Sequence, residues 1–440
     1  MTVIRAVAGI VTFLSTSSLF ADDWPQWGGP LRDCVWRETG IVEKLPAADP
    51  VSGVLPRVWT AKIAAGYAGP AVADGRVFVA DRVADDNLER VLCFDADTGK
   101  ELWKHQYEAP YSISYPLGPR ATPTVDGDRV YALGAVGHLF CFNAKDGRIF
   151  WQKHLPTDFG TELPAWGTAA APLIDGDHLI VLAGGKPGRM VVSLDKHTGD
   201  QRWAALDGKE PGYCPPIILE FGGKRQLIVW HPAAVVGLDP KSGDSLWSVP
   251  FAVEAGLTIS TPRKLGNRLF LTSFYNGPLM VDLGGDGQTP HVLWRGAPNN
   301  TEIKNNSLHS IMCTPVVTED FIYGVGSYGE LRCLETSTGR QVWETREPTG
   351  RDRWWNAFLI PHGDRTILCN EQGDIIFARL SGNGYKELDR AKLIEPTAPI
   401  QRRMTVWSHP AFAMGSVFAR NDGELIRVDL TNKEQAGAKQ

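Results

Sequence analysis

The sequence predicts an all-β fold, an eight-bladed β-propeller of four-stranded antiparallel blades. Tryptophan recurs at intervals of 44 to 52 residues, which is close to the length of one such blade. The segments between these tryptophans alternate between apolar and polar residues with a period of two and are rich in β-branched and aromatic residues. Helical repeats of similar length would instead need apolar spacings of three and four. The recurring positions are Trp59, Trp103, Trp151, Trp203, Trp247, Trp294 and Trp343.

The clearest repeat covers residues 122–151, TPTVDGDRVYALGAVGHLFCFNAKDGRIFW, and residues 314–343 follow the same plan. Each copy begins with an apolar strand and a turn of the Asp-Gly kind. A second strand, a glycine-rich turn, a third alternating strand and a further turn lead to a last strand that ends in tryptophan. This order predicts four short strands joined by tight hairpins.

First strands give an independent count of the repeats. They begin near Gly69, Thr122, Ala170, Cys214, Thr261, Thr314, Asn356 and His409. The turns that follow them are Asp74-Gly75, Asp126-Gly127, Asp175-Gly176, Gly222-Gly223, Gly266-Asn267, Glu319-Asp320, Gly363-Asp364 and Met414-Gly415. Both series predict eight blades.

The two ends of the chain are expected to share one blade. The eighth copy ends around Leu430 without a fourth strand, whereas residues 57–62 (RVWTAK) form a spare fourth strand ahead of the first full copy. The seventh copy is degenerate, with Leu388 near the place of the tryptophan. A ring that closes by letting the N-terminal strand complete the last blade removes the open sheet edges.

The repeated residues have structural interpretations. A large aromatic residue near the outer strand can bridge two sheets, because a single blade cannot bury both of its faces. The acidic or amide residue before the third turn can hydrogen-bond the turn backbone, and the closing glycine accepts a positive φ. These turns loosely resemble calcium loops, but each lacks the later acidic ligands, so hairpin chemistry is favoured.

The N-terminus is typical of a secretory signal peptide over residues 1–21, with cleavage after Ala21. An uncleaved N-terminal anchor is the alternative. We expect an extension at 22–56 that packs on the propeller, the propeller itself at 57–431 and a polar tail at 432–440. Trp24, Trp27 and Trp36 of the extension either form a lid or pack on the surface, and packing is favoured. The expected location is the periplasm or the outside of the cell, without a transmembrane segment.

Composition narrows the function. The net charge is −5 and no basic block occurs, so nucleic acid is not an expected partner. Cys93, Cys141 and Cys333 occupy one repeat position and are expected to be buried thiols, with disulfides as the alternative. No CxxC motif occurs and the histidines have no ligand spacing, so we assign no metal ligands. No catalytic constellation emerges either, and we expect a monomer.

The pattern A-x-x-G-x-x-x-W, found in DADTGKELW and NAKDGRIFW and with a lysine first in DKHTGDQRW, resembles the PQQ-like repeat. The resemblance extends from Arg57 to Leu430. One branch of this family, the quinoprotein dehydrogenases, binds pyrroloquinoline quinone and calcium in the central channel. The other is similar to the BamB lipoprotein, a non-catalytic scaffold in outer-membrane protein assembly. The segment DWPQWGGPLRDCVWRETGI also resembles the leader of exported PQQ-like repeat proteins of planctomycetes.

The chain departs from both branches. It lacks the adjacent cysteines that the dehydrogenases carry beside their cofactor, and their catalytic aspartate and calcium ligands match no motif in it. It also has no cysteine near Ala21 that could carry a lipid. The resemblance therefore implies the fold, and we assign no cofactor on its basis.

The candidate binding site lies in the loops that lead into the first strands, because these loops converge at one mouth of the central channel. They are rich in aromatic and cationic residues, namely Tyr67, Arg120, Trp166, Tyr213, His309, Trp355, Trp407 and His409. Ser260 and Trp354 lie at the same entry positions. Aromatic faces offer contact area at low entropy cost, and Arg120 would hold an anionic group. The alternative is that these side chains plug the channel by packing on one another.

The sequence is compatible with two functions. The favoured one is an exported, non-catalytic binding or scaffold propeller whose partner is a protein, a peptide or a small molecule. The alternative is a quinoprotein oxidoreductase that uses pyrroloquinoline quinone with calcium. A glycan- or peptide-binding module is a variant of the first.

Overall fold

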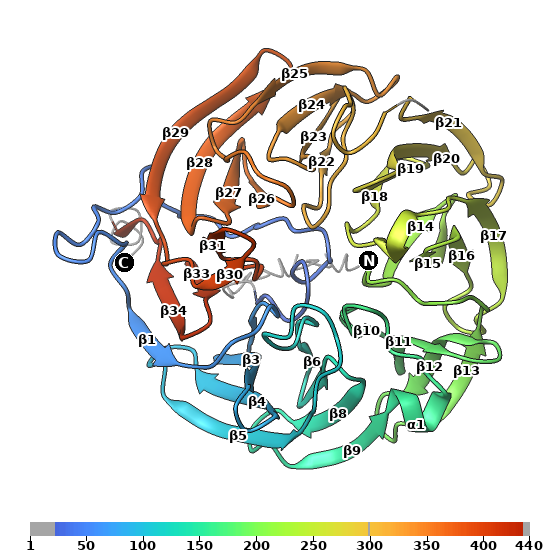
Figure 1. Ribbon diagram of the computed structural model, residues 1–440, viewed down its shortest axis with the longest axis horizontal. Coiled ribbons are helices and arrows are strands. Elements are labelled where there is room, and N and C mark those ends of the chain that lie inside the picture. Colours follow the sequence, from blue (N-terminus) through green and yellow to red (C-terminus); the bar gives the residue numbers. More distant parts are fainter. Residues whose placement is uncertain (1–22, 298–299, 434–440) are drawn as a thin grey trace, which may run out of the picture.

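The chain forms a ring of eight four-stranded antiparallel sheets, which confirms the predicted propeller (Figure 1). The computed structural model describes residues 23–297 and 300–433. The predicted signal peptide (1–21) and most of the predicted tail lie outside the described residues. Among the residues described, no helix is long and apolar enough to cross a membrane.

The first four blades follow one another along the chain. Blade 1 contains β2 (Ala71–Ala73), β3 (Arg76–Val83), β4 (Leu88–Asp95) and β5 (Glu101–Glu108). Blade 2 contains β6 (Thr124–Asp126), β7 (Arg129–Leu133), β8 (His138–Asn143) and β9 (Ile149–His154). Blade 3 contains β10 (Leu173–Asp175), β11 (His178–Gly185), β12 (Arg189–Asp195) and β13 (Gln201–Ala205). Blade 4 contains β14 (Ile217–Phe221), β15 (Lys224–His231), β16 (Ala234–Leu238) and β17 (Ser245–Pro250).

The remaining blades complete the ring. Blade 5 contains β18 (Arg263–Leu265), β19 (Arg268–Ser273), β20 (Gly277–Asp282) and β21 (His291–Arg295). Blade 6 contains β22 (Val316–Val317), β23 (Phe321–Val325), β24 (Leu331–Glu335) and β25 (Gln341–Thr345). Blade 7 contains β26 (Ala357–His362), β27 (Arg365–Asn370), β28 (Asp374–Ser381) and β29 (Gly384–Lys392). Blade 8 contains β32 (Ala411–Ala413), β33 (Ser416–Arg420), β34 (Glu424–Asp429) and the N-terminal β1 (Trp59–Lys62).

Blade 8 closes the ring as the sequence predicts. Trp59 lies opposite Arg427 and Lys62 opposite Glu424 in an antiparallel register. Arg57 adds a two-pronged ion pair to Glu424, with N–O distances of 2.6 and 2.8 Å. The last strand of the chain is therefore covered by its first strand, and no sheet edge is left open at the junction.

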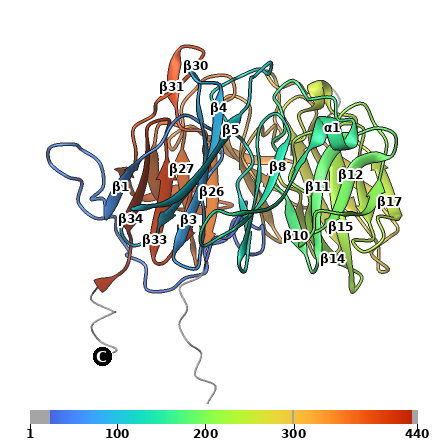
Figure 2. The same cartoon turned by 90° about the horizontal axis from the view of Figure 1, so that it is seen from below.

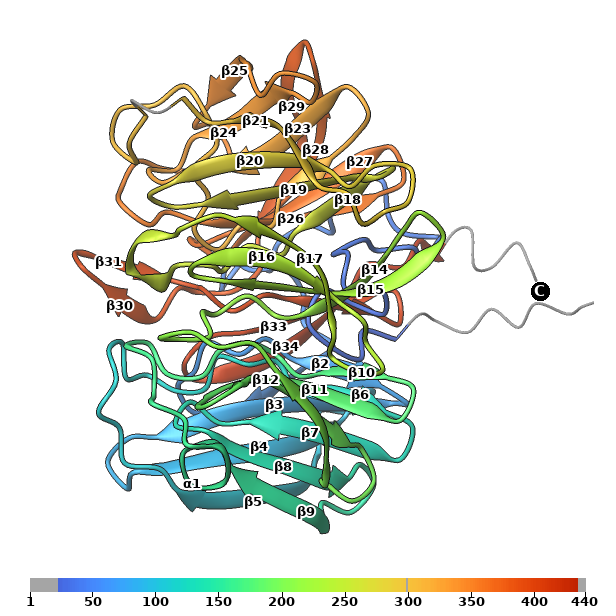
Figure 3. The same ribbon diagram turned by 90° about the vertical axis from the view of Figure 1, so that its right-hand side faces the viewer.

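The ring has two faces that differ in their connections. The upper face carries the loops between blades and the turns between second and third strands, and the lower face carries the other turns. The helix α1 (Leu155–Phe159) and the hairpin of β30 (Ala398–Ile400) and β31 (Arg403–Thr405) lie on the upper face (Figures 2 and 3). A short 3-10 helix, η1 (Glu254–Gly256), also belongs to a loop between blades.

The repeated tryptophans join each blade to the next. The Trp103 indole donates a hydrogen bond from Nε1 to the carbonyl of Ala144, at 3.0 Å, in the third turn of the following blade. Gly147 of that turn has a φ of 73°, and a Cβ added to it would lie 2.6 Å from the Trp103 ring. A side chain there would meet both backbone strain and a clash, which explains the recurring glycine. The same bond to the following blade is made by Trp59, Trp151, Trp203, Trp294 and Trp343.

Two blades deviate from the tryptophan pattern. Trp247 donates to Gln226 of its own blade instead of to the next blade. In blade 7 the register places Asp389, not Leu388, at the tryptophan position, because Leu388 occupies the β-bulge. The Asp389 carboxylate accepts the backbone N–H of Leu45 at 2.8 Å, so this edge of blade 7 binds the N-terminal extension.

The cysteines at the repeat position are buried and stand opposite the tryptophans. Cys93 pairs with Trp103, Cys141 with Trp151 and Cys333 with Trp343. All three are free thiols with no exposed surface. A small side chain at this place leaves room for the indole to turn toward the neighbouring blade.

The extension before β1 enters the lower end of the channel, at the centre of the ring in Figure 1. Trp24 forms a bridge to Val72 of the innermost strand of blade 1. The Arg32 guanidinium, 2% exposed, donates to the backbone carbonyls of Ala171, Pro172 and Pro216. The extension thus fills the channel from below.

Candidate functional site

A cavity of about 210 Å³ occupies the upper end of the central channel. Its wall comes almost entirely from the loops between blades, because these loops all turn toward the axis of the ring. Among the residues described, Arg120 is the one charged residue of the lining. The aromatic lining residues are Trp27, Tyr67, Tyr115, Trp166, Tyr213, Tyr275, Trp354, Phe358 and Trp407.

The extension forms the floor of this cavity. Trp27 lines it, and its indole Nε1 donates to the Thr261 hydroxyl at 3.0 Å. His409 packs beneath, with its ring 5.0 Å from Trp27 and 4.7 Å from Phe358. Burial lowers the pKa of His409 to about 4, so the imidazole is neutral at pH 7. Trp27 and His409 therefore close the cavity toward the lower face.

Arg120 organises the wall on the side of blades 1 and 2. Its guanidinium donates to the backbone carbonyls of Gly118, Ser114 and Tyr115 and lies 5.1 Å from the centre of the Tyr67 ring. Burial lowers the pKa of Arg120. Most of its donors serve the loop that carries Tyr115, which limits its capacity to hold an anionic ligand.

A buried carboxyl anchors the same loop. Glu89 has no exposed surface and accepts hydrogen bonds from the hydroxyls of Tyr107 and Tyr111 and from the Ala135 N–H. Burial raises the pKa of Glu89 above its ordinary value, against the effect of these bonds. Tyr111 begins the segment whose tip, Tyr115, has a φ of 53° and contacts Trp354 and Trp407 across the mouth.

The opposite wall is held by ion pairs. Glu371, 1% exposed, accepts hydrogen bonds from Arg403 and from the Trp407 indole, the latter at 2.9 Å. Arg353 lies 4.9 Å from the centre of the Trp354 ring and donates to the Tyr275 hydroxyl at 3.0 Å. The aromatic rings of this wall therefore have fixed orientations.

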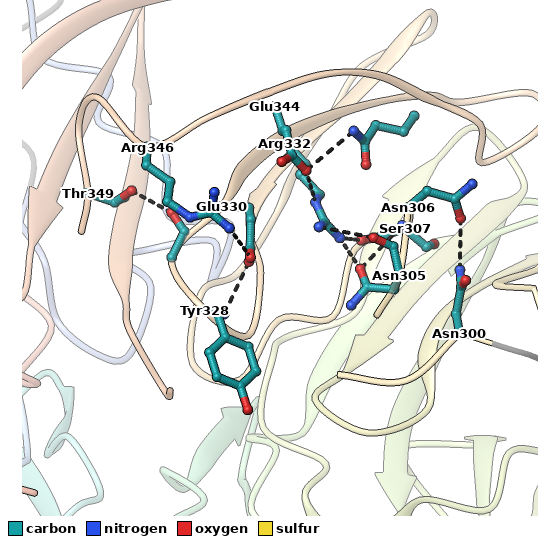
Figure 4. A network of polar contacts seen from close by, with 12 residues as sticks. Asn300, Asn305, Asn306, Ser307, Tyr328, Glu330, Arg332, Glu344, Arg346 and Thr349 are labelled. Atoms are coloured by element: carbon teal, nitrogen blue, oxygen red, sulfur yellow. Dashed lines mark hydrogen bonds and ion pairs between the residues drawn. The ribbon is translucent and has the colours of Figure 1, made fainter. Parts of the chain in front are cut away.

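A polar network in blade 6 supports the loops on either side of this wall (Figure 4). Arg332, 4% exposed, binds Glu344 at 3.1 Å and donates to Asn305 and to the Ser307 carbonyl. Glu330 pairs with Arg346 and accepts the N–H of Tyr328. The first group holds the loop before blade 6, and the second holds the loop that leads to Trp354.

Five of the eight predicted site residues line the cavity, and three lie outside its wall. The lining residues are Tyr67, Arg120, Trp166, Tyr213 and Trp407. His309 is buried against the Phe274 carbonyl, at 2.9 Å from Nδ1, and Trp355 is buried in the core of blades 6 and 7. His409 lies beneath the floor, as described above. The ligand-binding role of the whole set stays a prediction.

Sequence reasoning missed several lining residues. Tyr115 lies in a loop already considered, so counting every aromatic residue of those loops would have included it, as the neighbouring Trp354 was. Tyr275 belongs to a turn between second and third strands, which also faces upward. Trp27 could not be assigned to the cavity in this way, because it lies outside the repeats and reaches the cavity only when the extension folds back into the ring.

A second hollow, of about 530 Å³, lies at the outer edge of blades 1 and 2. His138 and His154 face each other there, with ring centres 4.5 Å apart, and burial with the neighbouring His154 lowers the pKa of His138 to about 4. The described part of the chain holds no group of three or more potential metal ligands, here or elsewhere. The channel cavity is the candidate site because five of the predicted residues line it.

The fold and the repeated turn-to-tryptophan contacts define an eight-bladed propeller of PQQ-like repeats. The family profile described as outer membrane protein assembly factor BamB matches residues 47–114 and 87–345. The matched region exceeds half of the chain, and the protein belongs to this family.

Individual relatives agree with this assignment. The chain is 24% identical over 348 residues to the outer membrane protein assembly factor BamB of Moranella endobia (strain PCIT), covering 77% of this chain and 71% of the relative. The crystal structure of BamB from Moraxella catarrhalis superposes with a TM-score of 0.58 at 16% identity, over 85% of this chain and all of that one. The quinohemoprotein alcohol dehydrogenase ADHIIG of Pseudomonas putida HK5 gives 0.59 at 11% identity, over 93% and 80%. These structures share the fold.

The cavity residues do not fit pyrroloquinoline quinone with calcium. Aromatic walls suit a flat ring, but the carboxylates of this cofactor need cationic partners, and Arg120 already serves three backbone carbonyls. Calcium needs six to eight oxygen ligands, whereas the wall residues described contribute no Asp or Glu. The donor set of this cavity disagrees with that cofactor.

Proposed function

We propose that this protein is an exported, non-catalytic binding propeller that holds a partner protein at the upper mouth of its channel. The observation that carries the proposal is the mostly apolar cavity at the upper end of the channel. Trp27 closes this cavity at its lower end, so that it opens on the upper face. Membership of the family of outer membrane protein assembly factors supports a scaffold role in the bacterial envelope.

The wall chemistry favours binding over catalysis. Aromatic and aliphatic side chains in a concave site supply contact area, and fixed rings lose little entropy when a ligand binds. The carboxyls nearest the wall, Glu89 and Glu371, are fully engaged by tyrosine hydroxyls or by Arg403 and Trp407. They hold loops and rings in place.

Photo-crosslinking in the source bacterium tests this function without assuming the partner. A photo-reactive amino acid replaces an exposed residue of the upper face, Arg351 or Arg402, which lie in loops between blades. For comparison it replaces an exposed residue of the lower face, Lys100 or Lys145, which lie in turns between third and fourth strands. We expect a discrete adduct from the upper positions only. The cavity-filling variant Ile311→Trp should remove that adduct while keeping the thermal midpoint of unfolding.

Adducts of equal yield from both faces, or an upper adduct that survives Ile311→Trp, would contradict the proposal. The cofactor alternative has its own test. Incubation with pyrroloquinoline quinone and calcium should leave no stoichiometric visible chromophore and no dye reduction. Appearance of both would replace the binding function by an oxidoreductase.

A further inference from the structure

The chemistry of the cavity wall selects the kind of group that can fill it. Every wall residue except Arg120 is uncharged, and the Arg120 donors point to backbone carbonyls of its own loop. Moving a charged ligand group into such a site would cost free energy without a partner to compensate. The occupant of the cavity is therefore an uncharged, largely apolar group.

Three polar atoms of the described wall residues lack a partner. The hydroxyls of Tyr67 and Tyr213 and the indole nitrogen of Trp354 are buried without a hydrogen bond. An indole N–H can only donate, and a tyrosine hydroxyl can donate as well. All three atoms are therefore suited to acceptor oxygens such as the carbonyls of a peptide backbone, which would remove the cost of leaving them unpaired.

The loops that carry Trp354 and Trp407 contribute unpaired positive charge to one side of the rim. Arg353 and Arg403 are paired with Glu302 and Glu371. Arg351, in the loop that carries Trp354, and Arg402, in the turn between β30 and β31, are exposed and form no ion pair or hydrogen bond within the described part of the chain. Two unpaired guanidinium groups in the loops that carry the wall residues Trp354 and Trp407 complement an apolar group with acidic neighbours.

We propose that the cavity receives an aromatic side chain presented by an acidic, extended segment of a partner polypeptide. The inference rests on the proposed function and adds the chemistry of the bound segment. The aromatic ring enters among Trp166, Tyr213 and Trp407, and the flanking backbone carbonyls meet Trp354 Nε1 and the Tyr67 hydroxyl. The flanking carboxylates lie against Arg351 and Arg402. Aromatic anchors in desolvated pockets commonly dominate such interfaces.

Titration calorimetry of the full protein with unlabelled, acetylated and amidated pentapeptides tests the proposal. The reference peptide has a central phenylalanine between two pairs of aspartates. We expect one-to-one binding, a loss of at least about tenfold when alanine replaces phenylalanine, and a similar loss when lysines replace the aspartates. Rising salt should weaken the reference peptide, because the rim contacts are exposed.

Variants assign the contacts to this site. The double variant Arg351→Glu/Arg402→Glu should weaken the reference peptide at least about fivefold and remove most of its salt dependence. The matched control, Lys100→Glu/Lys145→Glu, changes the net charge equally on the lower face and should leave the affinity unchanged. Trp354→Phe keeps a ring but removes the donor, and a loss of about fivefold is expected. Ile311→Trp should abolish binding.

Several results would overturn the inference. One is an affinity for the alanine or lysine peptide equal to that for the reference peptide. Another is an equal loss of affinity in the double variant of the upper face and in the control of the lower face. A third is binding of 3-phenylpropionate as tight as that of the reference peptide, since this would assign the cavity to a small aromatic acid. Absence of peptide binding at about 1 mM would also overturn it. In that case an upper-face crosslink that Ile311→Trp removes would leave the proposed function standing with a partner of different chemistry.

Discussion

At the scale of single residues, the contact between a turn glycine and a tryptophan predicts that glycines of different turns differ in the free energy of unfolding that they lose on substitution by alanine. Gly147 and Gly127 both have positive φ, 73° and 56°, but a Cβ would meet the Trp103 ring only at Gly147. Gly127→Ala should cost about 1–2 kcal/mol of unfolding free energy from backbone strain alone. Gly147→Ala should cost about 1–3 kcal/mol more through overpacking. Urea denaturation of both variants measures the difference, and equal losses would refute the steric account.

The buried Glu89 predicts a pH dependence of stability. Its pKa is raised in the folded protein, so the folded state favours the protonated carboxyl. The corresponding stabilisation is complete below the ordinary value of 4.5 and is lost as the pH rises through the folded pKa above it. Glu89→Gln keeps the size of the side chain but cannot ionise. As the pH rises above 4.5 and through the folded pKa, the thermal midpoint of the wild type should fall relative to that of this variant. A constant difference between the two midpoints from about pH 4 to about pH 8 would contradict this prediction.

At the scale of elements, the repeat pattern predicted the inner strands closely because each is bounded by a turn of fixed chemistry. All eight first strands begin within three residues of the expected positions, from Ala71 near Gly69 to Ala411 near His409. The sequence placed Leu388 only near the tryptophan position, and the offset of one residue to Asp389 has a physical cause. Blade 7 has a long hairpin of β28 and β29, and a bulge residue in a strand without tryptophan cannot be told from its neighbour by pattern alone.

The Arg32 side chain is predicted to hold the N-terminal extension in the channel. Arg32 is buried in the channel and bonded to three carbonyls, whereas Arg37 forms a partly exposed ion pair with Asp33. Hydrogen bonds to a charged group contribute about 1.5–3 kcal/mol each, and an exposed pair contributes at most about 1 kcal/mol. Arg32→Met should therefore reduce amide hydrogen-exchange protection over residues 24–36 at least about tenfold. Arg37→Met serves as the control, and equal protection in the two variants would show that Arg32 does not hold the extension.

At the scale of the whole molecule, the sequence predicted those site residues that the geometry of the ring alone brings together. Tyr67, Trp166 and Tyr213 are far apart in the chain, yet equivalent loops of a closed ring must converge on its axis. The floor could not be predicted in this way. Trp27 contacts Thr261 across 234 residues, and no periodicity links an extension to the blade that it meets. His309 and Trp355 occupy the expected loops, but packing turned their side chains into the core.

Closure of the ring should control stability and association together. A chain that begins at residue 63 lacks β1, so blade 8 loses the buried Trp59 and exposes the edge of β34. Loss of a buried tryptophan costs about 3–5 kcal/mol, and an uncovered strand offers unpaired N–H and C=O groups to other chains. We expect a lower thermal midpoint in calorimetry and concentration-dependent association in light scattering. A chain that begins at residue 39 keeps β1 but loses the part of the extension that fills the channel, so it should stay monomeric with a smaller loss of stability. If the two truncated chains behave alike, the junction of β1 with β34 is not what closes the ring.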